Sequence, residues 1–450
     1  MKAVVIGPGR IGAGFAGQAL RESGYEVVFL ARNPIIARHL DRVRRYRLNL
    51  SDGGRPKEVE VAPVRAVCTS ERERAADEIA TADIVVTAVG AANLRDVAPL
   101  IAAGLRQRAA PTNVLAFENM RNASRRLRDV VMERLREQRP AVDHGFAGAL
   151  VERVVAKRCG DPGADEPLVF VGETSTAFRV DRAGLVSPLP RIRGMILTDP
   201  YEAWVKRKLY TYSAGHVTAA YLGYLKGYHY IHSAIRDREI RAAVLAAMAE
   251  GQRGLAAHYG PEISGEKGAL LEIISRFDNA ALCDRIERVG RDPKRKLGAS
   301  ERLVGAAHLA EQAGVPPRNL ALAAAAALCF MEPDDPSAAE LEREIETKGP
   351  EKTIHRVCGL RPDRGLGKLV SEDSKRLLDG RNGGGLLLSL SAYLWSSWDG
   401  QPGRNGNGTG GRHGAANAAG TNGTEAPSEE NQAESAPTPM TPPARRWAAS

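Results

Sequence analysis

The sequence predicts an α/β protein whose N-terminal part is a doubly wound parallel β-sheet and whose C-terminal part is all-helical. The first 135 residues alternate short apolar runs with amphipathic stretches, the order expected of strands and crossover helices. A glycine-rich turn directly follows the first apolar run. Beyond about Pro190 the apolar residues recur with helical spacing over long stretches.

Runs rich in Val, Ile and Leu predict the strands, and amphipathic spacing predicts the helices. The expected strands are 4–6, 27–30, 84–89 and 113–117, with a late strand at 168–172. The expected helices are 13–23, 93–105 and 125–135, then 201–225, 234–259, 301–313 and 319–331. We therefore expect a sheet domain over 1–192 and a helical substrate domain over 193–398. Segment 399–450 is expected to be a disordered low-complexity tail, because it has almost no large apolar residues.

Composition excludes several classes of protein. No apolar window is long enough to cross a bilayer, and the nearest, 386–398, is short and contains serines. The N-terminus enters the first strand directly and leaves no room for a signal peptide, so we expect a cytoplasmic location. The five cysteines are scattered and odd in number, which favours neither a disulfide framework nor a zinc site.

The net charge of +9 raises the question of an anionic partner. Basic residues are interspersed with acidic ones, and no basic motif studded with aromatic residues occurs, so nucleic acid is not expected. Attraction of phosphorylated small molecules explains the excess equally well.

The turn after the first strand reads Ile6-Gly7-Pro8-Gly9-Arg10-Ile11-Gly12, which has the spacing Gly-x-Gly-x-x-Gly. Gly7 permits the tight turn, Gly9 allows close approach of a pyrophosphate, and Gly12 lets helix and strand pack closely. Free N–H groups at the start of the helix would face the phosphates. The first domain is therefore predicted to be a Rossmann domain, with all seven residues in contact with a dinucleotide.

The end of the second strand bears on which dinucleotide binds. An acidic residue usually stands there and binds the ribose hydroxyls of NAD. This chain has Ala31 and then Arg32, whose guanidinium suits the 2′-phosphate of NADP. We expect NAD or NADP, with NADP favoured; the alternative is that Arg32 is a solvated surface residue and NAD binds. Val89 and Gly90, in the turn after a later strand, are also expected cofactor contacts.

Lys208 and His216 are the main chemical candidates in the helical part. In an α-helix of 100° per residue they lie roughly 80° apart and two turns from each other, with Ser213 on the adjoining flank. The three side chains can therefore reach a common site. The alternative is that they are ordinary surface and core residues, the commoner fate of a Lys and a His on a helix.

Around these residues the sequence resembles the mannitol dehydrogenase family of polyol-specific long-chain dehydrogenases. Segment 208–216 matches the signature Lys-x-x-x-x-Asn-x-x-His except at the asparagine, which is Ser213 here. Further short matches run in one order from Met1 to about Leu366. They include 87–90, 118–120, 194–199, 220–223, 287–291, 295–297 and 348–350. The last three favour the sugar-phosphate branch of the family.

The resemblance implies reversible, metal-independent hydride transfer between a sugar-alcohol phosphate and a nicotinamide dinucleotide, with mannitol 1-phosphate and fructose 6-phosphate as substrates. It implies that Lys208 is the general base and that its pKa is lowered. Asn119 matches the amide that stabilises the developing alkoxide, and His216 would position the substrate oxygen. The sequence has no clustered Cys/His motif, in agreement with a metal-free mechanism.

Ser213 leaves the substrate open, because a hydroxyl is a shorter donor than an amide. The alternatives are a related dehydrogenase for an unphosphorylated polyol or a hexuronate, and a catalytically weakened dinucleotide-binding protein. For the substrate phosphate, Arg288 and Lys296 in the basic run 288–296 are the best candidates, although such a run is often a solvated face. The expected partner is a small-molecule sugar-alcohol phosphate, and the protein is expected to be a monomer or homodimer.

Overall fold

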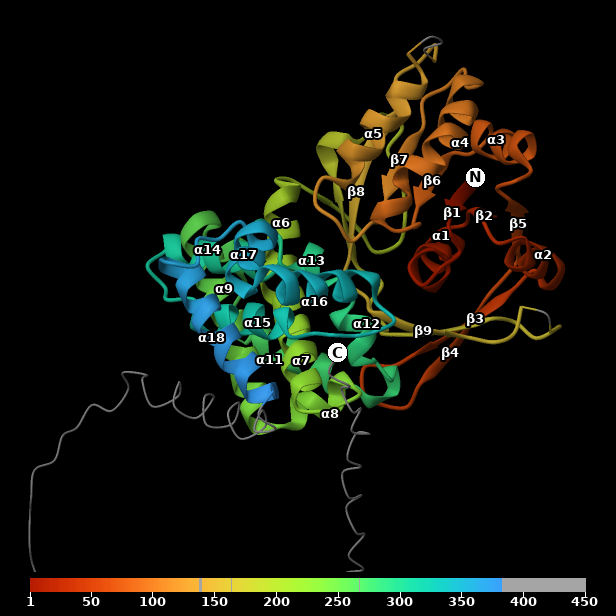
Figure 1. The fold of residues 1–450 in the computed structure, drawn as a ribbon. Coiled ribbons are helices and arrows are strands. Elements are labelled where there is room, and N and C mark those ends of the chain that lie inside the picture. The colour runs from red at the N-terminus through yellow and green to blue at the C-terminus, as the bar shows by residue number, and fades with distance from the viewer. Residues whose placement is uncertain (137–139, 163, 267, 383–450) are drawn as a thin grey trace, which may run out of the picture. The chain divides into compact units, whose positions relative to one another are not determined.

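The computed structural model describes residues 1–382 except 137–139, 163 and 267 (Figure 1). Its main sheet has eight strands in the order β12 (Met195–Thr198), β11 (Phe178–Asp181), β8 (Gly145–Val151), β7 (Asn113–Ala116), β6 (Ile84–Thr87), β1 (Lys2–Ile6), β2 (Glu26–Ala31) and β5 (Val64–Cys68). From β5 through β2, β1, β6 and β7 to β8, each pair of adjacent strands is parallel. Strand β11 is antiparallel to β8. The order β5-β2-β1-β6-β7-β8 is that of a Rossmann domain, so the predicted doubly wound sheet is confirmed.

Apolar side chains on both faces of each central strand explain why the strands are continuous hydrophobic runs. In β1, Val4 and Ile6 pack on one core, whereas Ala3 and Val5 pack on the other. The first core is covered by α3 (Arg72–Ala80), α4 (Leu94–Arg106) and α5 (Ala123–Arg134), and the second by α1 (Gln18–Glu22) and α2 (Pro34–Val43). A π-helical segment, η1 (Gly12–Gly17), precedes α1. The expected helix at 13–23 is therefore partly of π type.

A second, four-stranded sheet lies beside the first, and of its strands only the one at 168–172 is expected from the sequence. Its order is β4 (Lys57–Val61), β3 (Tyr46–Leu50), β10 (Val169–Gly172) and β9 (Val155–Cys159). Tyr46 joins the two sheets, because its ring packs edge-on against Phe29 of β2 and Phe170 of β10. Strand β9 runs close to η1, the segment that follows the glycine-rich loop, since a Cβ at Gly14 would lie 2.7 Å from a methyl of Val155.

The helical part begins at Tyr201, after β12 has completed the main sheet. This is later than the boundary expected between 192 and 193, because 195–198 pairs with β11. The larger helices are α6 (Tyr201–Lys208), α7 (Ala214–Leu225), α8 (Ile231–Arg236), α9 (Arg238–Tyr259), α11 (Ala269–Phe277), α14 (Val304–Gln312), α15 (Arg318–Leu328), α16 (Pro336–Lys348) and α18 (Gly365–Asn382).

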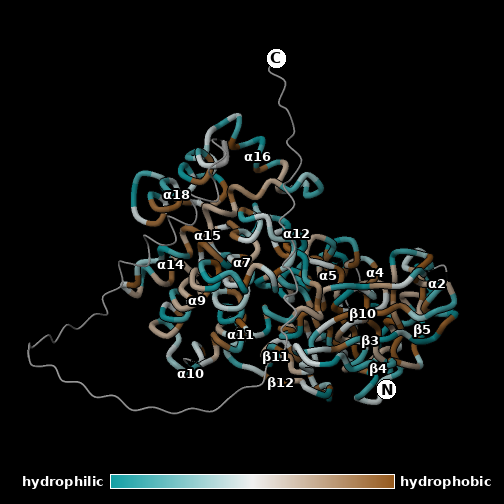
Figure 2. Tube along the Cα trace, turned by 90° about the horizontal axis from the view of Figure 1, so that it is seen from below, coloured by the Kyte–Doolittle hydropathy of each residue, from teal (hydrophilic) through white to brown (hydrophobic). Residues whose placement is uncertain are grey.

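Helices α7 and α15 provide much of the apolar core of this part. Every residue from Leu320 to Leu328 is buried, and Figure 2 shows hydrophobic residues concentrated along α15. The single helix expected over 234–259 is divided at Asp237, whose carboxylate accepts hydrogen bonds from the backbone N–H groups of Glu239 and Ile240 and caps α9.

The predicted disordered tail, 399–450, lies outside the described residues. Within the described part, no helix is both long and apolar enough to span a membrane.

Candidate active site

The glycine-rich loop has the geometry that a dinucleotide requires. Gly7 has a φ of +94°, and a Cβ there would lie 2.6 Å from the carbonyl oxygen of Ala88. A Cβ at Gly12 would lie 1.9 Å from the carbonyl oxygen of Gly7, whereas a Cβ at Gly9 would meet nothing within 4 Å. Packing thus requires glycine at 7 and 12. At Gly9 the backbone is open, as close approach of a phosphate demands.

Glu118 connects the turns that follow β6 and β7 through hydrogen bonds. Its carboxylate accepts hydrogen bonds from the backbone N–H of Val89 at 2.9 Å and of Gly90 at 2.8 Å. Burial raises the pKa of Glu118, although these hydrogen bonds oppose the rise. Glu118 has no role among the residues predicted from the sequence, although it directly follows an expected strand and belongs to the family match at 118–120. It positions the turn from which Val89 and Gly90 are expected to contact the cofactor.

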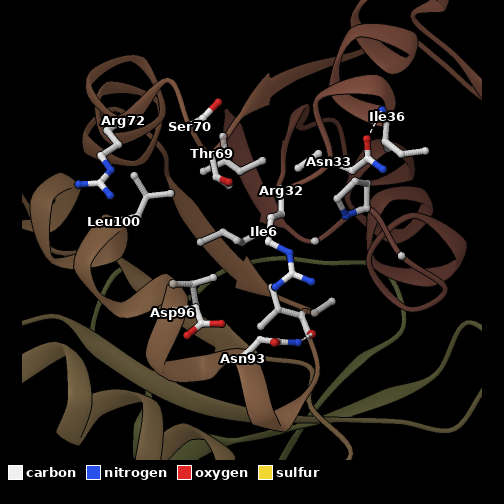
Figure 3. Close-up of a pocket in the computed structure, with 18 of the residues that line it drawn as sticks. Ile6, Arg32, Asn33, Ile36, Thr69, Ser70, Arg72, Asn93, Asp96 and Leu100 are labelled. Carbon is white, nitrogen blue, oxygen red and sulfur yellow. Dashed lines mark hydrogen bonds between the residues drawn. The ribbon is translucent and has the colours of Figure 1, made fainter. Parts of the chain in front are cut away.

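A cavity of about 840 Å³ opens at the carboxyl ends of β1, β2 and β6 (Figure 3). Arg32 is exposed and points into it, while Ala31 is buried. Ser70 and Arg72, from the loop and helix after β5, line it as well. Of the expected cofactor contacts, Ile6, Gly7, Pro8, Gly9, Arg32 and Val89 line this cavity, whereas Arg10, Ile11, Gly12 and Gly90 do not. The cavity lies where the strand order reverses between β1 and β6, the usual ligand position in such sheets.

Lys208 lies at the end of α6 and reaches the same edge of the sheet. Its Nζ donates a hydrogen bond to the backbone carbonyl of Val151, the last residue of β8. Burial lowers the pKa of Lys208 to about 8; Glu152 opposes this shift and Arg276 adds to it. An amine with this pKa is partly neutral near physiological pH, so it can accept a proton.

Asn119 and Ser213 are placed differently with respect to solvent. Ala116, the last residue of β7, pairs with Gly148 of β8, so Asn119 in the bend after β7 and Val151 at the end of β8 both follow this pair at the carboxyl edge of the sheet. Asn119 is exposed at this edge of the sheet. Ser213, in contrast, is buried.

The helix that bears Lys208 and His216 is not a regular α-helix. Residues Leu209–Ser213 form a π-helical segment, η4, between α6 and α7. A π segment has more residues per turn than an α-helix, so the roughly 80° separation calculated for a regular helix does not apply here. Segments of this type are frequent at functional sites.

His216 is held by side chains from elsewhere in the chain. Its Nε2 lies 3.0 Å from Oδ2 of Asp284, and its ring stacks on Phe277 with centroids 4.9 Å apart. Asp284 also accepts two hydrogen bonds from Arg288, at 2.5 and 2.7 Å. Burial would raise the pKa of Asp284, yet Arg288 and His216 hold it well below its usual range. Because an ionised carboxylate only accepts, Nε2 carries the proton and Nδ1 remains an acceptor.

Arg276 connects the surroundings of Lys208 and His216. Its guanidinium donates to the backbone carbonyl of Glu152, directly after Val151, and to the carboxylate of Glu173. It also stacks over the ring of Tyr212 at 4.4 Å, and that ring packs edge-on against His216. Arg276 and Tyr212 therefore link the surroundings of the two predicted catalytic side chains.

A second cavity, of about 650 Å³, shares Gly9 and Arg158 with the first. Arg288 lines it, as a phosphate ligand should, but Lys296 does not. Lys296 is only 5% exposed, and its Nζ donates to the backbone carbonyls of Val289 and Arg291 around the end of α12 (Ile286–Gly290). This corrects the pairing of Arg288 with Lys296, because the amine of Lys296 is engaged by backbone oxygens.

Comparison with known proteins identifies the family. The family model of the mannitol dehydrogenase Rossmann domain matches residues 1–194, and that of the mannitol dehydrogenase C-terminal domain matches residues 200–368. The chain belongs to the mannitol dehydrogenase family. Like other members, it is a nicotinamide-dinucleotide-dependent dehydrogenase acting on a CH–OH group.

Two curated members of the mannitol dehydrogenase family that resemble this chain are named mannitol-1-phosphate 5-dehydrogenase. The protein of Brevibacillus brevis is 38% identical over 386 residues, which cover 84% of this chain and 98% of that protein. The protein of Bacillus licheniformis is 38% identical over 378 residues, which cover 82% and 98%.

Two solved structures share the mannitol dehydrogenase fold. Mannitol 2-dehydrogenase of Pseudomonas fluorescens, in a ternary complex with NAD and D-mannitol, matches with a TM-score of 0.68 and 16% identity over 88% of this chain and 94% of its own. A substrate-free D-sorbitol dehydrogenase matches with a TM-score of 0.67 and 15% identity, over 87% and 95%.

Proposed function

We propose that this chain interconverts D-mannitol 1-phosphate and D-fructose 6-phosphate, with Lys208 as the general base. The names and high coverage of the bacterial relatives support the substrate pair. One observation carries the chemistry: an amine with a lowered pKa lies at the edge of the sheet from which the glycine-rich loop emerges.

The glycine-rich loop and the turn at 89–90 would hold the dinucleotide along the carboxyl edge of the sheet. When bound, the nicotinamide ring accepts the hydride from the substrate carbon or returns it. Glu118 acts as a positioning residue, because its carboxylate fixes the backbone of Val89 and Gly90.

Lys208 would take the proton of the hydroxyl group that becomes a carbonyl. The hydrogen bond to Val151 orients the amine and leaves the lone pair of its neutral form free for that proton. Nδ1 of His216 would accept a hydrogen bond from a substrate hydroxyl, and the amide of Asn119 would donate to the oxygen as its charge develops. Lys208 handles the proton itself, so the proposal includes no metal ion.

The purified full chain assayed with fructose 6-phosphate and NADH or NADPH tests this proposal. We expect rapid oxidation of the cofactor that depends on the phosphate, with much slower turnover of fructose. Equal or faster turnover of unphosphorylated sugars or hexuronates would contradict the substrate assignment. Cofactor binding without any turnover would indicate a weakened, non-catalytic relative.

We further propose that NADP(H) is preferred over NAD(H). Arg32 points into the first cavity, whose lining also includes Ser70 and Arg72 as donors for a 2′-phosphate, and Ala31 replaces the acidic residue that would repel it.

Arg32→Ala is expected to lower kcat/KM for NADPH by roughly tenfold and to leave that for NADH almost unchanged, since a hydrogen bond to a charged group contributes about 1.5–3 kcal/mol. Steady-state kinetics with both cofactors measures the ratio. Arg38→Ala is the matched control, because Arg38 is an exposed arginine of α2 outside the cavity lining. A wild-type preference for NADH would overturn the proposal.

A further inference from the structure

We propose that the phosphate group of the substrate binds in the second cavity, between Arg10 of the glycine-rich loop and Lys157 and Arg158 of β9. This inference rests on the proposed function and adds to it a binding subsite for a phosphate dianion. Of the two phosphate ligands expected from the sequence, Arg288 lines this cavity and Lys296 does not.

The lining of this cavity is strongly basic. It consists of Gly9, Arg10, Ala156, Lys157, Arg158, Tyr230, Cys283, Arg285 and Arg288, of which five are cationic and none is acidic. Arg288 is already paired with Asp284, and Arg285 pairs with Glu287 at 2.7 Å. Arg10, Lys157 and Arg158 form no ion pair within the described part of the chain. These three cations are available to an incoming anion.

Of the three cations, Arg10 has an unfavourable electrostatic environment. It is half-buried, and among the described residues its guanidinium donates only to the backbone carbonyl of Ala156, at 3.5 Å. Burial lowers the pKa of Arg10, the positive charges of Arg288 and Arg291 lower it further, and Asp284 only partly opposes them. An arginine stays protonated, so this arrangement has an electrostatic cost that a bound dianion would remove.

The position of the cavity suits the substrate. Arg288 lines it and also binds Asp284, the carboxylate that holds His216. Gly9 and Arg158 line the cofactor cavity too, so the second cavity lies beside the expected cofactor phosphates. A sugar chain positioned by His216 would therefore have its phosphate end near the three cations. Several converging donors are what a phosphate needs.

Lys157→Gln tests the subsite, because Lys157 lines the second cavity and not the first. We expect KM for fructose 6-phosphate to rise roughly tenfold, as one charge-assisted contact is lost. KM for the cofactor and kcat/KM for unphosphorylated fructose should stay within about twofold. Arg158→Gln should raise KM for both the sugar phosphate and the cofactor, since Arg158 lines both cavities.

Lys57→Gln is the matched control. Lys57 is an exposed lysine of β4, in the same small sheet, but it lines neither cavity. This variant makes the same change in net charge and should behave as the wild type. If Lys157→Gln and Lys57→Gln have the same KM for fructose 6-phosphate, the proposal is wrong.

Alkylation of Cys283 provides a readout that does not depend on turnover. Cys283 is exposed in this cavity, whereas Cys159, on β9, does not line it. In the wild type, inorganic phosphate should slow the reaction of Cys283 with iodoacetamide severalfold and should not slow that of Cys159. In the Lys157→Gln, Arg158→Gln double variant, phosphate should no longer slow the reaction of Cys283. Peptide mass spectrometry follows each cysteine.

These two experiments separate the subsite from the proposed function. Protection of Cys283 by inorganic phosphate, without turnover of any sugar phosphate, would contradict the proposed function but support a phosphate site in this cavity. Turnover of fructose 6-phosphate with no protection and an unchanged KM in Lys157→Gln would support the function and overturn the subsite.

Discussion

Lys208→Met is expected to lower kcat for oxidation of mannitol 1-phosphate by roughly 10²- to 10⁴-fold, the range by which a positioned general base contributes. Methionine retains most of the apolar stem but has no amine to take the proton. It also removes the hydrogen bond to the carbonyl of Val151. Binding of the dinucleotide should persist, because the glycine-rich loop is unchanged. Single-turnover kinetics and a cofactor titration measure the two effects.

Lys206→Met serves as the control for the loss of a lysine in the same helix. Lys206 is also half-buried, but its Nζ donates to the hydroxyl of Tyr259, away from the sheet edge. We expect its kcat to stay within a fewfold of the wild type. A Lys208→Met enzyme that binds cofactor and retains more than a tenth of the wild-type kcat would contradict the role of Lys208.

Asp284→Asn is expected to lower the free energy of unfolding by about 3 kcal/mol, because breaking a buried ion pair leaves a charge without its partner. The Asp284 side chain is 7% exposed and accepts both hydrogen bonds of Arg288. The amide keeps the shape and one acceptor but loses the charge. Turnover should fall as well, since His216 is no longer held in one tautomer. Urea unfolding and steady-state kinetics measure the two effects.

Glu287→Gln is the matched control for this second prediction. It breaks the pair of Glu287 with Arg285, whose side chains are 32% and 60% exposed. An exposed pair of this kind contributes less than about 1 kcal/mol. Equal effects of Asp284→Asn and Glu287→Gln on stability would show that the Asp284 cluster is not the structural support that we infer.

The cofactor side of the site could be largely predicted from the sequence because its geometry is local. The loop from Gly7 to Gly12 joins one strand to one helix within a few residues, so its spacing specifies its shape. Arg32 follows from its position at the end of the next strand.

The substrate side depends on contacts that no local pattern encodes. Asp284 contacts His216 across 68 positions of the chain. Lys157 and Arg158 belong to β9, a strand that was not expected from the sequence although its partner β10 follows it closely in the chain. The π segment at Leu209–Ser213 changes the direction of His216 relative to Lys208 from that in a regular α-helix. Lys296 lies in a basic run, yet burial rather than sequence decides that it binds backbone carbonyls.

The central claim, that Lys208 takes the substrate proton, is tested most directly by the pH dependence of kcat/KM in both directions, between about pH 7 and 9.5. Burial lowers the pKa of Lys208 to about 8, so we expect mannitol 1-phosphate oxidation to rise with pH, with its midpoint near pH 8, and to level off about one pH unit higher as the amine becomes neutral. Fructose 6-phosphate reduction needs the protonated amine and should fall through the same pH. The second ionisation of the phosphate, near pKa 6, lies below this range. The absence of a transition near pH 8 in either direction would contradict the account. So would a transition near pH 8 that persists in the residual activity of Lys208→Met.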